Sequence, residues 1–340
     1  MLKDAFTFEK LLQAHKKCRL SKQHKRETIS FEINLGANLT TLSRSLLNQT
    51  YKVGGYRQFY IYEPKKRNIE ALCYKDRVVL MAFCTNIIEP KLEKKLIYDN
   101  VACRKNKGTF FGIKRLEKFL HDYFKKHKTN KGYFLKCDIK KYFQSINHDV
   151  LFQNLKTSGL DEEDLWLVNE ILNSRNSETG VGLPIGNQTS QWFGLFYLNK
   201  IDRLIKEKLQ IKYYVRYMDD MILVHHNKEY LKHCKQQIEE MANTVLKLQL
   251  NSKTQICQLK NGIDFLGFRH VLTNSGKVVR FLRGQAKTRL KKNLKKLRLF
   301  KGAGLINDEF ISLRLKAYGA HLSQGNTWKL FNNLKKKNNL

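Results

Sequence analysis

The sequence contains only three prolines in 340 residues, and no Ser- or Gly-rich linker interrupts it. This shortage predicts subdomains that interlock rather than independent domains joined by linkers. No run of about 18 apolar residues occurs either, which argues against a transmembrane helix. The first 18 residues read as an amphipathic helix without the apolar core of a signal peptide. We therefore expect a cytoplasmic protein without a membrane partner.

The sequence also lacks paired cysteines. Seven cysteines occur, an odd number without a CxxC pair, which is typical of free thiols rather than of disulfides or zinc ligands. The adjacent His225 and His226 have metal-binding side chains, but their position favours the end of a strand.

Acidic residues are scarce: 64 Lys and Arg stand against 30 Asp and Glu, which gives a formal net charge of +34. Such a chain repels itself unless a polyanion neutralises it, so nucleic acid is the first expected partner and an anionic membrane surface the second. From Lys277 to Lys301 there are eleven basic residues and no acid. Leu290, Leu294 and Leu297 recur there at helical spacing, which predicts a basic amphipathic helix. Its basic face is either solvated or in contact with a polyphosphate backbone.

The hydrophobic pattern predicts helices over most of residues 1–50, followed by a mixture of strands and helices of the α+β class. Hairpins are expected over residues 56–73, 212–226 and 262–279, and a buried strand over 133–137. Helices are expected from about residues 76, 148, 189 and 228.

The stretch Tyr213–His226, YYVRYMDDMILVHH, places two adjacent aspartates in an otherwise apolar segment. Burying two like charges together is costly. Asp138 ends a predicted strand 81 residues before Asp219. If the two strands pair in one sheet, the carboxylates of Asp138, Asp219 and Asp220 converge and favour Mg²⁺, which prefers oxygen ligands. Two such ions would support an in-line phosphoryl transfer. The alternative is a turn that carries Asp-Asp only because turns favour Asp, and its apolar flanks argue against that.

At these residues the chain resembles the reverse transcriptases. Tyr217–Asp220, YMDD, is similar to their active-site motif, and FLKCDIKKYFQSI resembles their first aspartate motif. A basic turn, a Gly turn with its helix, LNSKT and GIDFLGF follow the order of the family, and the likeness extends over about residues 55–275. It implies a right-hand polymerase fold of the α+β class with fingers, a palm containing an antiparallel sheet with the Asp-Asp hairpin, and a short helical thumb. The implied division is 1–130 for N-terminal helices and fingers, 131–275 for the palm with inserted fingers elements near 150–190, and 276–340 for the basic thumb.

The resemblance also implies the roles of single residues in an RNA-directed DNA polymerase. Asp138 and Asp219 would hold two Mg²⁺ ions, which Mn²⁺ can replace, together with the main-chain carbonyl of Ile139. Asp220 would be the supporting carboxylate. The residues implied in nucleotide binding are Lys65, Lys66 and Arg67 in the basic turn, Phe143 under the sugar, Ile185, Gly186 and Gln191 in and after the Gly turn, and Lys253 in LNSKT. The lysines expected along the template–product backbone are Lys287, Lys291, Lys292, Lys295 and Lys296. A core aromatic at Phe143 and a plain surface lysine at Lys253 are the alternatives.

One segment indicates which subgroup of reverse transcriptases the chain resembles. Most reverse transcriptases have Gln-Gly, three residues and Ser-Pro at the Gly turn, whereas here Ile185 precedes Gly186 and Gln191 replaces the proline. These departures, with residues 99–113 and 316–331, resemble the reverse transcriptases of diversity-generating retroelements, which are group II intron-like prokaryotic enzymes. That likeness implies a bacterial, archaeal or phage-encoded enzyme that uses deoxynucleoside triphosphates to copy a template-repeat RNA into cDNA. Errors at template adenines then diversify a variable gene, and a pentameric helical-bundle accessory protein is the implied partner. Another prokaryotic reverse transcriptase (retron, group II intron-like or phage-defence) and an inactive RNA-binding relic are the alternatives.

Overall fold

The structure is a computed structural model that describes residues 2–63, 65–175 and 179–339. The chain forms two compact units, each built from three separate segments. Unit 1 comprises Met1–Cys103, Ile139–Lys208 and Gln236–Asn251, and unit 2 comprises Arg104–Asp138, Leu209–Lys235 and Ser252–Leu340. These units do not follow the order of the expected fingers, palm and thumb along the chain, so the division at residues 130 and 275 stays a prediction.

Unit 1 is mainly helical, and the expectation of helices over residues 1–50 is confirmed. Its elements are α1 (Leu2–Ala5), α2 (Phe8–Arg19), α3 (Arg26–Ile33), α4 (Leu35–Leu47), β1 (Tyr56–Ile61), β2 (Arg67–Leu72), α5 (Tyr74–Phe83), a π-helical turn (Cys84–Ile88), α6 (Glu89–Glu93), α8 (Tyr142–Ser145), α9 (His148–Lys156), α10 (Glu162–Asn173), α11 (Gln188–Tyr197), α12 (Asn199–Arg203) and a second π-helical turn (Leu204–Lys208). Local signals start several helices: the Asp161 side chain accepts a hydrogen bond from the main-chain nitrogen of Asp164, which caps α10.

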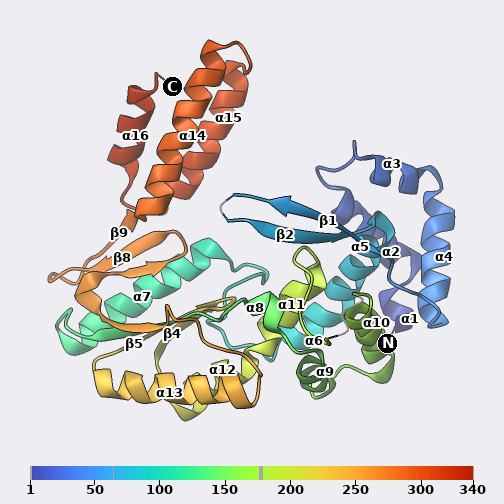
Figure 1. The fold of residues 1–340 in the computed structure, drawn as a ribbon, viewed down its shortest axis with the longest axis horizontal. Helices are drawn as coiled ribbons and strands as arrows, with labels where there is room; N and C mark the ends of the chain where they lie inside the picture. Colours follow the sequence, from blue (N-terminus) through green and yellow to red (C-terminus); the bar gives the residue numbers. More distant parts are fainter. Residues whose placement is uncertain (1, 64, 176–178, 340) are drawn as a thin grey trace. The chain divides into compact units, whose positions relative to one another are not determined.

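The hairpin of β1 and β2, drawn in blue in Figure 1, is anchored at its base by one buried carboxylate. Asp76 is fully buried at the start of α5. It accepts hydrogen bonds from Tyr51 Oη at 2.7 Å, from the main-chain nitrogen of Gly54 at 2.9 Å and from Cys73 Sγ at 2.9 Å. Because these donors precede β1 and follow β2, the carboxylate ties both ends of the hairpin to α5.

Unit 2 contains two antiparallel sheets. The first has the strand order β4-β5-β3-β6, and the second has the order β7-β8-β9. The elements of the unit are α7 (Thr109–His127), β3 (Tyr133–Cys137), β4 (Tyr213–Tyr217), β5 (Asp220–His225), β6 (Gln255–Gln258), a short 3-10 turn (Leu259–Asn261), β7 (Ile263–Phe265), β8 (Phe268–Leu272), β9 (Val278–Leu282), α14 (Gly284–Gly302), α15 (Asp308–Leu322) and α16 (Trp328–Lys337). A further helix, α13 (Lys228–Thr244), begins in unit 2 and ends in unit 1.

The expected single hairpin over residues 262–279 is instead a three-stranded sheet, and this expectation was incomplete. The turn at Leu266 and Gly267 has φ values of 47° and 90°, so it reverses the chain after only three residues of β7. β9 then pairs with β8 through Val279 and Val271.

The last three helices pack side by side, as the orange and red ribbons in Figure 1 show. Their shared core consists of Leu290, Leu294, Leu297, Leu322, Phe331 and Leu334. The first three are the leucines whose spacing predicted a helix, so that prediction is confirmed.

No helix within the described ranges is both long and apolar enough to span a membrane. All seven cysteines are free thiols, as their number and spacing predicted.

Candidate active site

The tip of the β4–β5 hairpin carries the paired aspartates. Tyr217 pairs with Asp220, which leaves Met218 and Asp219 as a two-residue turn. Met218 has a φ of 54°, a conformation in which two-residue turns usually have glycine. The guanidinium of the fully buried Arg216 donates a hydrogen bond from Nη1 to the Met218 carbonyl at 2.9 Å. Arg216 therefore supports the strained residue next to Asp219.

Asp138 directly follows β3 at the same end of the sheet. β3 pairs with β5, and the last pair of their register is Cys137 with Met221, so Asp138 and Asp220 come next on the two strands. The main-chain nitrogen of Asp138 donates to Thr254 Oγ1 at 3.3 Å, and that hydroxyl lies 3.4 Å from the Asp138 carbonyl. The strand pairing on which the predicted convergence depends is thus present.

Lys136 lies on β3 two residues before Asp138, and alternation along a strand places both side chains on one face. Its Nζ lies 3.1 Å from Asp220 Oδ1, donates to Asp220 Oδ2 at 3.3 Å and donates to the Asp264 carbonyl at 2.6 Å. This ammonium group therefore partly neutralises the carboxylate cluster.

Burial and neighbouring negative charges disfavour the ionisation of Asp219 and Asp220. Burial raises the pKa of Asp219 to about 6, the negative charges of Asp138 and Asp220 raise it as well, and Arg216 opposes them. Burial also raises the pKa of Asp220, and the charge of Asp138 adds to that effect against the opposing charges of Lys136 and Arg283. A bound cation would relieve this repulsion.

The donor set fits a hard cation in its chemistry. Asp220 Oδ1 is buried and accepts no hydrogen bond within the described part of the chain, because Lys136 approaches it without hydrogen-bond geometry. Among residues 2–63, 65–175 and 179–339, however, no group of three or more His, Cys, Asp or Glu side chains is placed so that it could hold a metal ion. Mg²⁺ commonly binds through only one or two carboxylates, waters and substrate phosphates. The expected two-ion site therefore stays a proposal.

The Gly turn lies in unit 1 against the edge of β2. The main-chain nitrogen of Glu70 donates to the Ile185 carbonyl at 3.2 Å. Gly186 has a φ of 139°, and a Cβ built on it would lie 3.2 Å from the Glu70 carbonyl oxygen. Only glycine fits this conformation and this close approach.

A comparison with protein families decides the class of the chain. Residues 54–270, more than half of the sequence, match the profile of the family described as reverse transcriptase (RNA-dependent DNA polymerase). The chain belongs to the reverse transcriptase family. No curated protein matches the sequence significantly.

Solved telomerase structures have a similar fold. Telomerase from Candida albicans, in complex with a TWJ fragment of telomeric RNA, aligns at a TM-score of 0.53 and 13% identity over 85% of this chain and 55% of the other. Telomerase from Candida tropicalis aligns at 0.52 and 15% identity in the same kind of complex, over 89% and 59%, and at 0.51 and 16% identity in its apo form, over 73% and 53%. At these identities the likeness shows the reverse transcriptase fold alone. The chain spans little more than half the length of these telomerase chains.

The other predicted nucleotide-binding residues of this reverse transcriptase fall in both units. In unit 1, Lys65, Lys66 and Arg67 are exposed at the β1–β2 turn, and Gln191 is exposed in the first turn of α11. Lys253 is exposed in unit 2, just before β6.

Phe143 also lies in unit 1, close in space to the residues around the Gly turn. Its carbonyl accepts a hydrogen bond from the main-chain nitrogen of Leu183 at 2.7 Å. Its half-buried ring lies 3.2 Å from the position that a Cβ on Gly194 would occupy. The ring therefore packs where α11 lacks a side chain.

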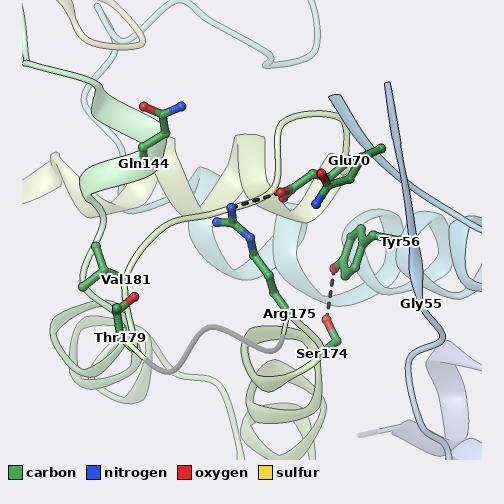
Figure 2. A pocket seen from close by; sticks show the side chains of 9 residues that line it. Gly55, Tyr56, Glu70, Gln144, Ser174, Arg175, Thr179 and Val181 are labelled. Carbon is green, nitrogen blue, oxygen red and sulfur yellow. Dashed lines mark hydrogen bonds and ion pairs between the residues drawn. The ribbon is translucent and has the colours of Figure 1, made fainter. Parts of the chain in front are cut away.

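A cavity of about 690 Å³ in unit 1 adjoins the Gly turn, and Figure 2 shows its lining. Arg175 Nη2 donates to the buried Glu70 Oε1 at 3.0 Å, and Tyr56 Oη lies 3.0 Å from Ser174 Oγ. Because the main chain of Glu70 also bonds to Ile185, the ion pair connects the segment after α10 to the Gly turn through β2. Sequence reasoning missed Glu70 and Arg175.

The five lysines predicted along the nucleic-acid backbone are exposed on α14, and Leu290, Leu294 and Leu297 of that helix are buried. Their solvent-facing position is consistent with either a solvated or a phosphate-binding face.

Sequence reasoning also missed the two cations next to the carboxylates. Lys136 and Arg216 are each the single charged residue within their strand, in YFLKC and YYVRY. A charge within an apolar strand requires a partner, and that signal would have pointed from both residues to the aspartates.

Proposed function

We propose that this chain is an RNA-directed DNA polymerase that copies a template-repeat RNA into adenine-mutagenised cDNA by two-metal-ion nucleotidyl transfer. The observation that carries the polymerase assignment is the set of three aspartates at one end of a single sheet, with the pKa of Asp219 raised to about 6 by burial and by its neighbours. A relic without catalytic function would have no reason to keep this costly arrangement. Membership of the reverse transcriptase family supports the same reaction.

Asp138, Asp219 and the Ile139 carbonyl would hold the metal ions, and Asp220 would support them. When bound, two Mg²⁺ ions lower the pKa of the primer 3′-hydroxyl and stabilise charge on the leaving pyrophosphate. Lys136 holds the Asp220 carboxylate in place through its second hydrogen bond to the Asp264 carbonyl. Arg216 fixes the main chain on which Asp219 is carried.

Exchanging Asp219→Asn together with Asp220→Asn tests the catalytic assignment. We expect DNA synthesis on a primed RNA to fall by at least about 10³-fold, because several kcal/mol of charge stabilisation are lost. RNA affinity and folding should persist, since the exchange relieves repulsion. The matched control, Asp4→Asn with Asp149→Asn, removes two exposed acids. Synthesis by the first variant at the parent rate would end the two-metal proposal.

The nucleotide-binding role rests on residues of unit 1. Lys65, Lys66 and Arg67 supply exposed positive charge for a triphosphate, and Phe143 supplies an aromatic ring for the sugar. Lys253 supplies one more cation from unit 2, as a proton donor to pyrophosphate, and Gln191 is carried on α11 after the turn.

We attribute the proposed errors at template adenines to Ile185. Glutamine at this position can hydrogen-bond the sugar region of the incoming nucleotide, whereas isoleucine offers only apolar contact. A lost hydrogen bond is worth about 0.5–1.5 kcal/mol, up to roughly tenfold in preference. Arg67 on β2 is proposed to modulate the geometry of the incoming nucleotide as well. Ile185 occupies the turn that bonds to Glu70, and Gly186 beside it admits no side chain.

Copying a defined RNA with Ile185→Gln and with the parent tests this proposal by sequencing of the cDNA. Misincorporation opposite adenine should fall in the variant by up to about tenfold, with little change opposite other bases. Ile29→Gln, an exchange at an exposed isoleucine, is the control. Equal adenine error rates in all three proteins would show that Ile185 has no role in fidelity. That result would favour the alternative, another prokaryotic reverse transcriptase.

The lysines of α14 are proposed to follow the template–product backbone. Changing Lys291, Lys292, Lys295 and Lys296 to Ala should weaken RNA binding and flatten its salt dependence by about one unit per lost contact. Four exposed lysines of the N-terminal segment provide the control: Lys3, Lys10, Lys16 and Lys22. An unchanged slope would assign the α14 lysines to a solvated face.

The retroelement assignment also carries a partner, a pentameric helical-bundle accessory protein that binds this strongly basic chain. Its measurable consequence is cDNA synthesis on the template-repeat RNA that increases when the accessory protein is added. Equal cDNA synthesis with and without the accessory protein would contradict the proposed partnership and leave the polymerase assignment unaffected.

A further inference from the structure

Unit 2 carries a row of aromatic rings at the end of β5 that is remote from Asp220. In order of contact, its members are Tyr123, His127, His226, His225, Tyr230 and His233. Successive ring centroids lie 4.5, 5.1, 4.4, 4.9 and 6.1 Å apart. The rings come from α7, β5 with the residue after it, and the first turns of α13. We call these six residues the ring row.

The ring row runs from the buried Tyr123 to rings that are open to solvent. His226 and His233 are exposed, while His127 and His225 are half-buried. Burial lowers the pKa of His127 and of His225, and the neighbouring His226 and Lys126 lower both further. Aromatic rings offer faces on which other planar groups can stack.

A basic cavity of about 390 Å³ adjoins the ring row. Its polar side chains are those of Asn130, Lys131, Gln258, Lys260 and Asn274, and it has no acidic lining residue. Neither Lys131 nor Lys260 has an ion-pair partner in the described part of the chain. The Asn130 amide donates to Asn274 Oδ1 at 2.7 Å, which leaves the Asn274 amide nitrogen as a further donor. Two unpaired cations and several amides favour an anionic ligand with hydrogen-bonding groups.

The cavity and the ring row form one continuous surface. Tyr123 Oη donates to the Lys131 carbonyl at 2.6 Å, so the buried end of the ring row supports the rim of the cavity. A Cβ on Gly132 would overlap the same hydroxyl, which shows how closely the two pack. Tyr133 lines the cavity and is the cross-strand neighbour of His225.

We infer that this surface binds an unpaired stretch of RNA, with bases stacked on the ring row and phosphate groups at Lys131 and Lys260. Single-stranded nucleic acid is bound by basic grooves combined with aromatic side chains on which successive bases stack. β5 separates the surface from Asp220 by roughly 17 Å, at about 3.3 Å per residue. We take the bound stretch to be a part of the RNA other than the nucleotides at the aspartates. This inference rests on the proposed function, because it takes the template RNA as the ligand.

Two primed RNA templates, one with an unpaired RNA extension of about ten nucleotides and one without it, test the inference. The full-length parent should bind the extended substrate more tightly. His226→Ala with His233→Ala should reduce that gain by about fivefold or more, with an unchanged salt slope, since a stacked base contributes this much. Lys131→Gln with Lys260→Gln should also reduce the gain and should flatten the salt slope by about 1.4 units, at about 0.7 per contact on a single strand.

Control variants separate this result from general effects. His24→Ala removes an exposed histidine of unit 1, and Lys3→Gln with Lys10→Gln removes two exposed charges there, so neither should change the gain. His226→Phe keeps a ring and should retain binding. An extension of abasic linker should lose its dependence on the histidines and keep its dependence on the lysines, because it has phosphates without bases.

Loss of affinity for both substrates alike, or retention of the full gain in both double variants, would overturn the inference. All of these variants should extend the short substrate at the parent rate. If the parent extends no substrate at all, the proposed function fails, whereas the gain from the extension is still measured by binding.

Discussion

Two tight turns carry residues proposed to act in nucleotide binding and in catalysis, and they accommodate a positive φ in different ways. At Gly186 the backbone of β2 comes so close that a Cβ would lie 3.2 Å from a carbonyl oxygen. At Met218 the side chain is kept, and the buried guanidinium of Arg216 bonds to the carbonyl of the strained residue. The Gly turn thus requires that position 186 has no side chain, whereas the turn of Met218 and Asp219 is supported by the buried charge of Arg216. We therefore expect added side-chain volume to destabilise the Gly turn, and changes of charge or pH to alter the stability of the turn of Met218 and Asp219.

The largest effect is expected from removing the buried charge. Arg216→Met takes the cation from beside Asp219 and leaves its carboxylate without that counter-charge. The Met218 carbonyl loses its donor and Asp219 loses a charge that favours its ionised form, so we expect a loss of about 1–3 kcal/mol in the free energy of unfolding, measured with denaturant, and a loss of DNA synthesis. Arg44→Met, at an exposed arginine, should change neither. A fully stable Arg216→Met variant would show that the turn holds without charge.

The pH should change the stability of the Asp219 turn but not that of the Gly turn, and this effect should be smaller than that of Arg216→Met. Asp219 has a folded pKa of about 6, above the ordinary value of 3.8, so its charge costs stability fully above pH 6. That cost is relieved as the pH falls through 6 towards 3.8, and its upper bound is about 3 kcal/mol before solvent screening. The metal-free parent should therefore lose less stability between pH 7 and 5 than Asp219→Asn.

Comparing the unfolding free energies of the parent and Asp219→Asn between pH 7 and 5 isolates this contribution. Added Mg²⁺ should shrink the difference at pH 7, because the bound cation replaces the proton. Gly186→Ala, which changes no charge, should follow the pH profile of the parent. Parallel curves for the parent and Asp219→Asn would contradict the raised pKa.

The smallest effects concern the backbone itself. Gly186→Ala forces a side chain into a φ of 139° against the Glu70 carbonyl and should cost about 1–3 kcal/mol. Met218→Gly removes the strain of a positive φ but gains flexibility in the unfolded chain, so its net effect should lie within about 1 kcal/mol of zero. Thermal or denaturant unfolding compares the two variants. Equal costs at the two positions would contradict this difference between the turns.

The sequence predicted those parts of the fold that local patterns determine. The paired strands β1 and β2, the buried strand β3 and the hairpin around Asp219 all follow from alternation and turn residues within a few positions. Asp138 was placed correctly at the end of its strand for the same reason.

What the sequence did not predict depends on register and on distant partners. The short β6 gave no clear signal of its own and is a strand because it pairs with β3 through Cys257 and Phe134. The contact of Lys136 with Asp220 requires the alignment of Lys136 with Ile222 across two strands that are 86 residues apart at that pair. Glu70 and Arg175 are separated by 105 residues and meet only because the segment that follows α10 reaches β2.

The close packing of Tyr123 against Gly132 has a consequence for how this sequence can diverge. Any residue other than glycine at position 132 would displace the Tyr123 hydroxyl, and with it the hydrogen bond to the Lys131 carbonyl. Tyr123 also contacts Tyr213 of β4 at a centroid distance of 6.0 Å, so its displacement would reach the strand that ends at the aspartate turn. Selection should therefore treat the two positions as one unit. Among related proteins, a larger residue at 132 should occur together with the loss of the tyrosine hydroxyl at 123, and either change alone should be rare.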